Sequence, residues 1–255
     1  MNPEIKPHGS WKSPISPERI AAGSLGLSQL QVAHERVYWT ETRPKESGRV
    51  ALVSAAIEGG APREEIPASM CARNRVNEYG SGTYCVGQSA LWFTNLDDQR
   101  LYRVAQDGSC APITPAVSED HRYSDPQLSR DERWIVCQRE RHLPRDLRRA
   151  ALPSEVFNEL VLIPADGTSA PVVIASGCDF YGTACFRPDG KALAWLQWNH
   201  PNMPWDGSEL FVAELADGGL LENPRRVAGG PAVSVVQPSW SHDGLLHFVS
   251  DKTGW

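Results

Sequence analysis

The chain has 255 residues, of which 41% are hydrophobic, and its formal net charge is −6 at pH 7. This negative charge, without a continuous run of Lys or Arg, argues against a nucleic-acid-binding surface. No apolar run approaches the roughly 20 residues that a membrane-spanning helix needs, and the N-terminus lacks the apolar segment of a secretory signal. We therefore expect neither nucleic acid nor a membrane among the partners.

Residues 1–26 are predicted to form an N-terminal arm. Its first part is polar and proline-rich, which favours an extended backbone, and a short helix is expected to start at Glu18. The segment around Ile15 is the candidate to pair with an apolar strand near residues 245–250 at the other end of the chain. Such pairing would cover an open strand edge.

The rest of the chain repeats one pattern, which is an apolar strand, a polar turn and a second apolar strand. The pattern is clearest around Asp189 and Gly190, because the glycine can adopt a positive φ and Leu193 and Trp195 then alternate along the next strand. It recurs at intervals of about 50 residues, and a period of this length is typical of repeat architectures. Units of four short strands with no helical periodicity between them indicate the blades of a propeller.

We therefore predict an all-β fold, a β-propeller of four-stranded antiparallel blades, over residues 27–255. The expected blades cover residues 27–67, 68–116, 117–176, 177–229 and 230–255. The fifth contains only two predicted strands, so the sequence reads as a truncated propeller. The third includes a polar excursion up to Glu155, which is either a surface insertion or a rim loop that contacts a partner.

The six cysteines include no Cys-x-x-Cys pair. Cys85, Cys137 and Cys185 fall within predicted strands, where a cysteine usually behaves as a small buried apolar residue. We expect reduced, structural cysteines rather than a disulfide framework, and a cytoplasmic protein follows from that expectation.

Two stretches are richer in polar and aromatic residues than a blade requires. Residues 73–82 combine Arg75, Glu78 and Tyr79 with two glycines, and residues 195–210 contain three tryptophans, two prolines and His200. The simpler interpretation of the first stretch is a glycine-assisted connection whose charges face water. The functional interpretation places Arg75 and Glu78 on one rim of the propeller, where a charged ligand or a neighbouring domain meets them.

His200 is the one histidine of the second stretch. A single loop histidine is more often hydrogen-bonded than catalytic, and no second His or Cys stands at metal-ligand spacing from it. We therefore expect no metal and no cofactor.

Four segments together resemble the N-terminal propeller of the prolyl oligopeptidase family of serine peptidases, in particular its dipeptidyl aminopeptidase and acylaminoacyl peptidase-like branch. They are residues 77–80 (Asn-Glu-Tyr-Gly), 139–142 (Arg-Glu-Arg-His), 198–207 (Trp-Asn-His-Pro-Asn-Met-Pro-Trp-Asp-Gly) and 250–255 (Ser-Asp-Lys-Thr-Gly-Trp). The resemblance spans nearly the whole chain. The chain departs from the family pattern at Asn77, where a histidine is usual, and at Ser81, where a third glycine is usual.

This resemblance implies a two-part enzyme, in which the propeller covers the active site of a C-terminal α/β-hydrolase domain, excludes folded proteins and helps to hold the N-terminal end of a short peptide. In that case Arg75, Glu78 and Tyr79 would contact the substrate, since a carboxylate suits an amine and a guanidinium suits a carboxylate or carbonyl. The rim that faces the hydrolase domain would include Arg139, His142, Asn199, His200, Trp205 and Asp206.

The chain itself contains no nucleophile elbow, because no serine has a glycine both two residues before it and two residues after it. Without that serine, the Asp and His residues form no catalytic triad. We therefore expect the chain by itself to hydrolyse nothing and to be the gating and docking portion of a peptidase.

Two alternatives compete with the peptidase interpretation. One is a non-catalytic propeller scaffold that binds protein partners through its rim. The other is a five-bladed sugar-active enzyme, which needs paired carboxylates that converge on the central channel.

Overall fold

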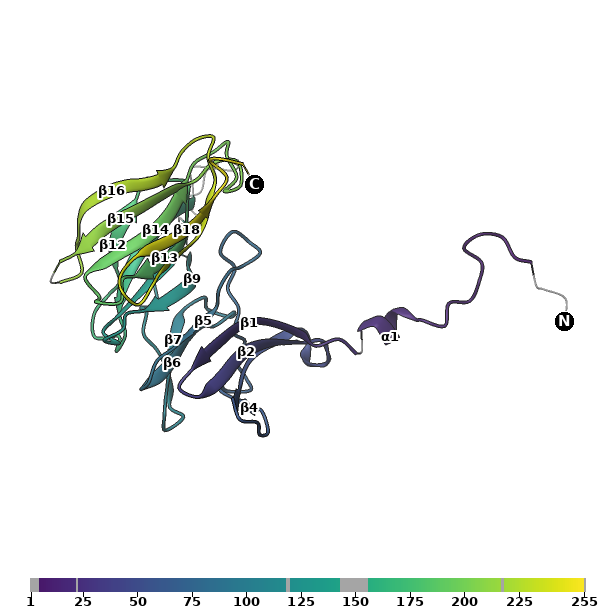
Figure 1. Cartoon of the computed structure of the whole chain (residues 1–255). Helices are drawn as coiled ribbons and strands as arrows, with labels where there is room; N and C mark the ends of the chain where they lie inside the picture. Colours follow the sequence, from purple (N-terminus) through teal and green to yellow (C-terminus); the bar gives the residue numbers. More distant parts are fainter. Residues whose placement is uncertain (1–4, 22, 118–119, 143–155, 217, 255) are drawn as a thin grey trace.

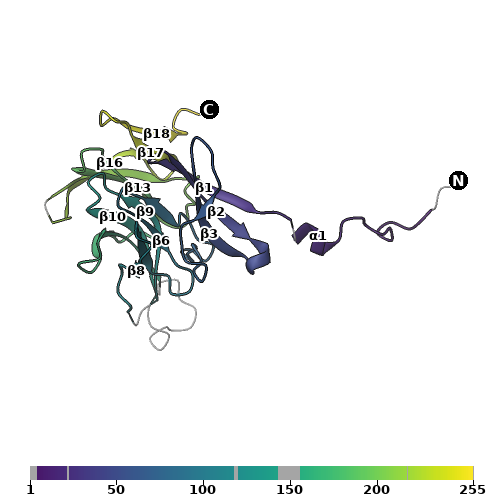
Figure 2. The same ribbon diagram turned by 90° about the horizontal axis from the view of Figure 1, so that it is seen from below.

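The computed structural model describes residues 5–21, 23–117, 120–142, 156–216 and 218–254, and these residues form an almost entirely β structure. Four antiparallel sheets of four strands and a final sheet of two strands follow one another along the chain (Figures 1 and 2). Neighbouring strands in each sheet are also consecutive in the sequence, so every blade is a simple meander. The predicted all-β propeller fold, with an incomplete last repeat, is confirmed.

The strand bounds, sheet by sheet, are as follows. The first sheet contains β1 (Gly26–Ala33), β2 (Arg36–Arg43), β3 (Arg49–Ala56) and β4 (Arg63–Glu64). The second contains β5 (Tyr84–Val86), β6 (Ala90–Thr94), β7 (Leu101–Ala105) and β8 (Cys110–Pro112). The third contains β9 (Asp120–Leu128), β10 (Trp134–His142), β11 (Val156–Pro164) and β12 (Val172–Ser176). The fourth contains β13 (Phe180–Phe186), β14 (Ala192–Trp198), β15 (Glu209–Leu215) and β16 (Leu221–Gly229), and the fifth contains β17 (Val235–Trp240) and β18 (Leu246–Ser250).

The turn between β13 and β14 explains why aspartate and glycine recur at this point of the repeat. Asp189 Oδ1 accepts a hydrogen bond of 2.9 Å from the backbone N–H of Lys191, and Gly190 has a φ of +73°. In the turn between β9 and β10, Asp131 accepts the corresponding bond from the N–H of Arg133 at 3.2 Å. Side-chain-to-backbone bonds over two residues need no distant partner, so the sequence alone predicts these turns.

The hydrophobic cores lie between consecutive sheets. The second and third sheets share a core that includes Trp92, Ile135 and Val161, each at most 1% exposed. The third and fourth sheets share another, with Leu160 and Leu193. Because each inner blade packs against two neighbours, stability comes from the stack rather than from any single sheet.

All six cysteines are free, and Cys85, Cys137 and Cys185 lie in strands as predicted. Burial raises the pKa of the Cys85 and Cys137 thiols above the ordinary range of a cysteine. A neutral, buried thiol is a poor nucleophile, because the reactive species is the thiolate.

In the native protein, the three buried cysteines Cys71, Cys85 and Cys137 are therefore expected to react with a thiol reagent at least about 100-fold more slowly than in the unfolded chain. The half-buried Cys110, Cys178 and Cys185 react before them. Mass spectrometry of timed alkylation, with denatured protein as the reference, measures the order. Early labelling of Cys137 would contradict the burial of β10.

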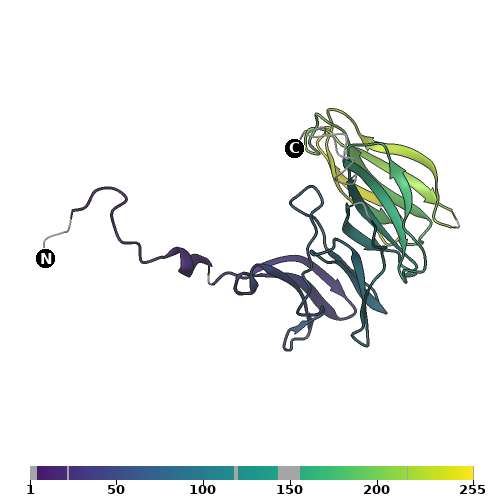
Figure 3. The ribbon, with the colours of Figure 1, turned by 180° about the vertical axis from the view of Figure 1, so that it is seen from behind.

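The N-terminal arm does not pair with β18, so that expectation is wrong. Among the described residues β18 pairs with β17 alone, and the arm extends away from the sheets (Figures 1 and 3). Pro14 and Pro17 flank Ile15 and have no N–H to donate to a strand partner. Instead, Ser16 Oγ accepts a hydrogen bond from the N–H of Arg19 and caps the short helix α1 (Pro17–Ala21), near the predicted helix start.

Among the residues that the structure describes, the other helical segment is the 3₁₀ turn η1 (Pro44–Glu46) between β2 and β3. Within the described part of the chain, no helix is long and apolar enough to span a membrane. The polar excursion predicted up to Glu155 falls on residues 143–155, which lie outside the described residues.

Candidate functional site

A cavity of about 880 Å³ opens on the rim of the propeller where β10 ends and β11 and β13 begin. Its wall is formed by the connection between the first two blades, the rim ends of the third blade, the link between the third and fourth blades, and the loop after β14. Inter-blade connections and strand ends thus converge on one place, although they are distant in the sequence. Concave sites of this size are typical for small ligands.

The connection at residues 73–82 is held in shape by Asn74, which is fully buried. Asn74 Oδ1 accepts hydrogen bonds from the backbone N–H groups of Val76 and Ser81, and its Nδ2 donates to the carbonyls of Ser81 and Gly82. Gly80 has a φ of +81°, and a Cβ there would lie 2.6 Å from the Asn74 carbonyl oxygen. The side-chain amide of Asn74 therefore holds together the loop that carries Glu78.

Asp125 fastens the same loop to the third blade. Its carboxylate accepts hydrogen bonds from Ser81 Oγ at 2.5 Å and from the N–H of Gly82 at 2.8 Å. Burial raises the pKa of the Asp125 carboxyl above its ordinary value, and the two hydrogen bonds partly oppose that rise. These two hydrogen bonds attach the loop to β9 independently of the contacts that Glu78 makes.

Arg122 on β9 does not line the cavity itself, but it contacts three carboxylates, two of which, those of Glu78 and Glu140, do line it. Its guanidinium nitrogens lie 2.7 Å from Glu78 Oε1, 3.1 Å from Asp120 Oδ2 and 3.2 Å from Glu140 Oε1. Burial lowers the pKa of this guanidinium, but the Glu78 hydrogen bond and the neighbouring carboxylates outweigh it, so the pKa lies above its ordinary value. One positive charge faces three negative ones, which leaves an excess of negative charge.

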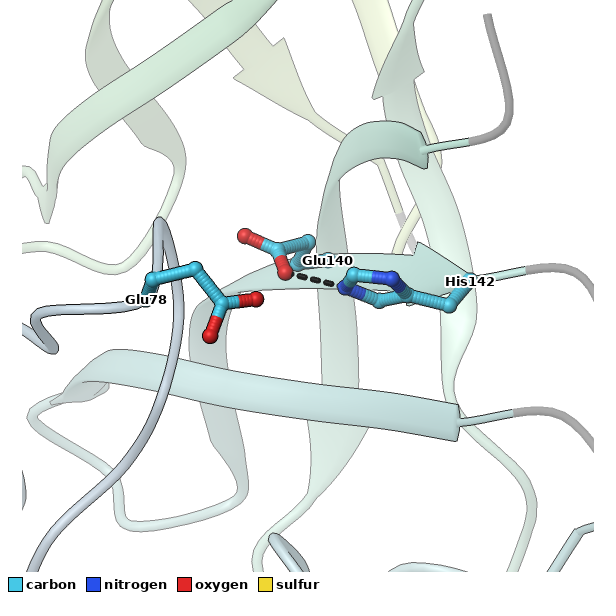
Figure 4. Close-up of side chains that lie close together, drawn as sticks. All are labelled: Glu78, Glu140 and His142. Atoms are coloured by element: carbon cyan, nitrogen blue, oxygen red, sulfur yellow. Dashed lines mark hydrogen bonds and ion pairs between the residues drawn. The ribbon is translucent and has the colours of Figure 1, made fainter. Parts of the chain in front are cut away.

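Figure 4 shows Glu78, Glu140 and His142 with their side chains gathered at one point. Glu140 and His142 are two residues apart on β10, so they lie on the same face of the strand, and His142 Nε2 is hydrogen-bonded to Glu140 Oε1. Glu140 Oε2 accepts a bond of 2.5 Å from the backbone N–H of Asn77. Glu78 comes from the opposite side and is exposed, and its hydrogen bond to Arg122 holds its pKa below the ordinary value.

The same three side chains form a possible metal-ligand set, because their donor atoms all lie within 4.8 Å of one another. Two carboxylates and an imidazole suit several divalent ions. However, Arg122 Nη1 already donates to both Glu78 Oε1 and Glu140 Oε1. A metal ion would have to displace this guanidinium, so the arrangement fits a hydrogen-bonded charge cluster better than a metal centre.

The lining of the cavity also includes the apolar residues Phe157, Phe180 and Met203. The Arg141 guanidinium lies over the Phe157 ring at 4.6 Å from its centroid. Phe180 stacks on Trp198, with ring centroids 5.4 Å apart, and also meets the edge of His200 at 4.9 Å. The lining of the cavity thus combines acidic with aromatic residues.

The loop after β14 is ordered by hydrogen bonds to the link between the third and fourth blades. Asp179 donates its backbone N–H to Asn199 Oδ1 at 2.7 Å, and its Oδ2 accepts from the N–H of His200 at 2.8 Å. Asp206 Oδ2 accepts from the N–H of Met203 at 3.0 Å. Asn199 and Asp206 therefore shape the loop, whereas His200 and Met203 reach the cavity.

The residues singled out from the sequence divide into two groups. Glu78, Tyr79, His142 and His200 line the cavity; Arg75, Arg139, Asn199, Trp205 and Asp206 do not. The Arg75 side chain is exposed; the backbone carbonyl of this residue accepts from Arg122 at 2.9 Å, and its backbone N–H donates to Gln99 Oε1 at 2.6 Å. Arg139 is buried and paired with Glu159 Oε2, and Trp205 is 66% exposed.

Several residues of the site are not predicted by the sequence, namely Asp120, Arg122, Glu140, Phe157, Phe180 and Met203. For the charged residues among them, the sequence does contain one signal, which is their spacing. Asp120 and Arg122 are two residues apart, as are Glu140 and His142, and within the strands β9 and β10 this spacing places each pair on one face. That the two faces meet at Glu78 is decided by the packing of the blades.

Comparison with known proteins gives two kinds of result. No protein-family model matches the chain, and no curated protein matches it. Among solved structures, a Mycobacterium tuberculosis puromycin-hydrolyzing peptidase is 37% identical with a TM-score of 0.86, and the match covers 98% of this chain and 39% of that one. A puromycin hydrolase is 32% identical with a TM-score of 0.85, over 98% of this chain and 39% of that one.

A more distant structure, a prolyl endopeptidase, matches 90% of this chain and 33% of its own at 12% identity, with a TM-score of 0.61. That likeness concerns the fold alone. The chain thus spans about two fifths of the length of the peptidases that it matches at higher identity.

Proposed function

Because the chain belongs to the prolyl oligopeptidase family of serine peptidases as a propeller portion, we propose that it is the gating and docking part of a peptidase that cleaves short peptides. Its docking site is the rim cavity, and its ligand there is the free amino terminus of the peptide. The observation that carries this proposal is the charge around Arg122, where three carboxylates face one guanidinium.

An ammonium group is the ligand that this charge distribution favours. It brings one positive charge and three N–H donors, and hydrogen bonds between ionised partners are roughly twice as strong as neutral ones. Glu78 presents its carboxylate to solvent, and its Oε2 carries no hydrogen bond among the described residues. Glu140, in contrast, is buried and held by Asn77 and His142, so it supplies a fixed negative charge behind Glu78.

The proposal also assigns roles to the other site residues that were predicted from the sequence. Tyr79, His142 and His200 line the docking cavity. The rim that would face the C-terminal α/β-hydrolase domain contains Arg75, Asn199, Trp205 and Asp206. Arg139 does not line the cavity, but it is paired with Glu159, which does. Six free cysteines suit a reducing compartment, and we place the protein in the cytoplasm on that ground.

The proposal is tested by binding of Phe-Gly-Gly-amide to the chain at pH 7, measured by calorimetry beside the N-acetylated peptide. We expect Glu78→Gln to weaken binding by about 10-fold or more, since it removes a charge-assisted hydrogen bond. Glu209→Gln is the matched control, because Glu209 pairs with one exposed arginine outside the cavity, Arg226, and it should leave the affinity unchanged.

N-acetylation removes the positive charge of the peptide and should weaken binding as much as the loss of Glu78. If the acetylated peptide binds as tightly as the free one, the amine is not recognised. The scaffold interpretation would then be the better account of the rim.

A further inference from the structure

A second cavity, of about 510 Å³, adjoins the docking cavity at the loop of residues 73–82. Tyr79 lines both cavities, so the two lie next to each other. They also share a rim. The lining of the second cavity includes Thr42 near the end of β2, and that of the docking cavity includes His142 at the end of β10. Because β2 and β10 are the second strands of their blades, both strands end at the same rim.

Hydroxyl groups of the first sheet converge on the second cavity. Ser28 pairs with Thr40 across β1 and β2, and Thr42 lies two residues further along β2, so the three side chains share one face of the sheet. Tyr38 lies on the same face and packs in the core shared with the second sheet, so this face looks toward the second blade. Ser28 and Thr40 are hydrogen-bonded to each other at 2.8 Å, whereas the Thr42 hydroxyl has no hydrogen-bond partner among the described residues.

Arg73 is the one charged residue in the lining of the second cavity. Its side chain is exposed, and among the described residues its guanidinium makes no ion pair and no hydrogen bond. The carboxylate of Asp125 lies behind this lining, where it accepts hydrogen bonds from Ser81 and Gly82. An unpaired guanidinium beside a free hydroxyl donor favours an anionic group, and its planar fork suits the two oxygens of a carboxylate.

Arg73 and Glu78 are close enough for one short peptide to contact both. The backbone N–H of Glu78 donates to the Arg75 carbonyl at 2.9 Å, and a turn of this kind brings the two Cα atoms within about 7 Å. Arg73 stands two residues before Arg75, so the Cα atoms of Arg73 and Glu78 are at most about 15 Å apart. An extended tripeptide is about 10 Å long, and the side chains of Arg73 and Glu78 can cover the remaining distance.

We propose that the second cavity binds the terminal carboxylate of the same short peptide whose amino group lies at Glu78. Arg73 supplies the positive charge, and Thr42 is a further hydrogen-bond donor. The inference rests on the proposed function, because the amino group fixes one end of the peptide. It names the substrate class as peptides of about three residues with both termini free. A much longer peptide must form a loop to reach both groups, which costs conformational entropy.

The test compares Phe-Gly-Gly, which has a free carboxylate, with Phe-Gly-Gly-amide by calorimetric titration into the chain at pH 7. We expect the free acid to bind about 10-fold more tightly, since it gains a hydrogen bond between ionised groups. The carboxylates around Arg122 alone favour the opposite order, because they repel an anion. For a peptide of Phe followed by eight glycines, the acid and the amide should differ by less than about 3-fold.

The decisive variant is Arg73→Gln, which is expected to reduce the acid-to-amide preference from about 10-fold to about 2-fold or less. Arg225→Gln is the matched control and should leave the preference intact. Arg225 is also exposed and has no ion pair among the described residues, but it lies on β16, outside the lining of either cavity. Both variants remove one positive charge from the chain, and both are first compared with the unchanged chain by their melting curves.

Two failures are distinguishable in this experiment. If N-acetylation of the amide abolishes binding but the acid and the amide bind equally, amine docking stands and the carboxylate site is wrong. If acetylation has no effect, the proposed function itself is wrong. A preference for the acid that survives Arg73→Gln, or that Arg225→Gln removes equally, would also overturn the inference. An undiminished preference with the nine-residue peptide would contradict simultaneous binding of both ends.

Discussion

Arg122→Met is expected to lower the free energy of unfolding by about 3–5 kcal/mol. The side chain of Glu140 is 4% exposed, and Arg122 is the cation that compensates its charge. Methionine fills a similar volume but leaves this buried carboxylate uncompensated, and breaking a buried ion pair is far more costly than losing an exposed one. Urea unfolding at pH 8, where an ordinary imidazole is neutral, measures the loss.

The control for this prediction is Arg226→Met. Arg226 is half exposed and pairs with Glu209, so its loss should change the free energy of unfolding by less than about 1 kcal/mol. The double variant Arg122→Met with Glu140→Gln removes both charges and should recover at least half of the loss. Equal effects of the two single arginine variants would mean that Glu140 is not dependent on Arg122.

Gly229→Ala is expected to be the second large effect, with a loss of about 3 kcal/mol or more in the free energy of unfolding. Gly229 ends β16 with a φ of +84°, and a Cβ at this position would lie 1.9 Å from the carbonyl oxygen of Ser208. Ser208 is 1% exposed and joins the fourth and fifth blades, because its hydroxyl donates to the Val235 carbonyl and accepts from the Val235 N–H. The alanine methyl group therefore displaces a buried link between blades.

Gly190→Ala is the control for this prediction, because it introduces the backbone strain of an alanine at positive φ without the steric crowding expected at Gly229. Gly190 also has a positive φ, +73°, but a Cβ there meets no atom within 4 Å. It should lose only about 1–2 kcal/mol, the strain of an alanine in the left-handed region. Thermal and urea unfolding of both variants give the comparison, and similar losses would show that Ser208 moves aside at little cost.

The repeat architecture can be predicted from the sequence because its determinants are local. The Asp189 turn is made by one side-chain-to-backbone bond and one glycine, and the alternation of Leu193 and Trp195 follows from the period of a strand. For the N-terminal arm, the prediction of strand pairing from such local patterns is wrong. The apolar Ile15 predicts a strand there, but the neighbouring prolines and the Ser16 cap favour an isolated short helix.

The site could be predicted only in part. Glu78 and His200 stand out in the sequence because their segments are denser in polar and aromatic residues than blades need, and His142 stands out through the family resemblance of residues 139–142. Arg122 lies in an ordinary strand, 44 residues after Glu78 and 18 before Glu140, so no local pattern marks it as their common partner. Arg75, in contrast, is prominent in the sequence, but its side chain lies outside the cavity wall.

The sequence by itself determined the strands, the turns and the blade repeat, because hydrogen bonds over two residues and the two-residue period of a strand act within one segment. Only the tertiary structure decided which charges meet. Blade stacking brings β9, β10 and the loop of Glu78 to one rim, and the strong distance dependence of charge and hydrogen-bond interactions then makes Arg122 the common partner of Glu78 and Glu140. Phe157, Phe180 and Met203 likewise line one cavity only because two blades and the loop after β14 adjoin there.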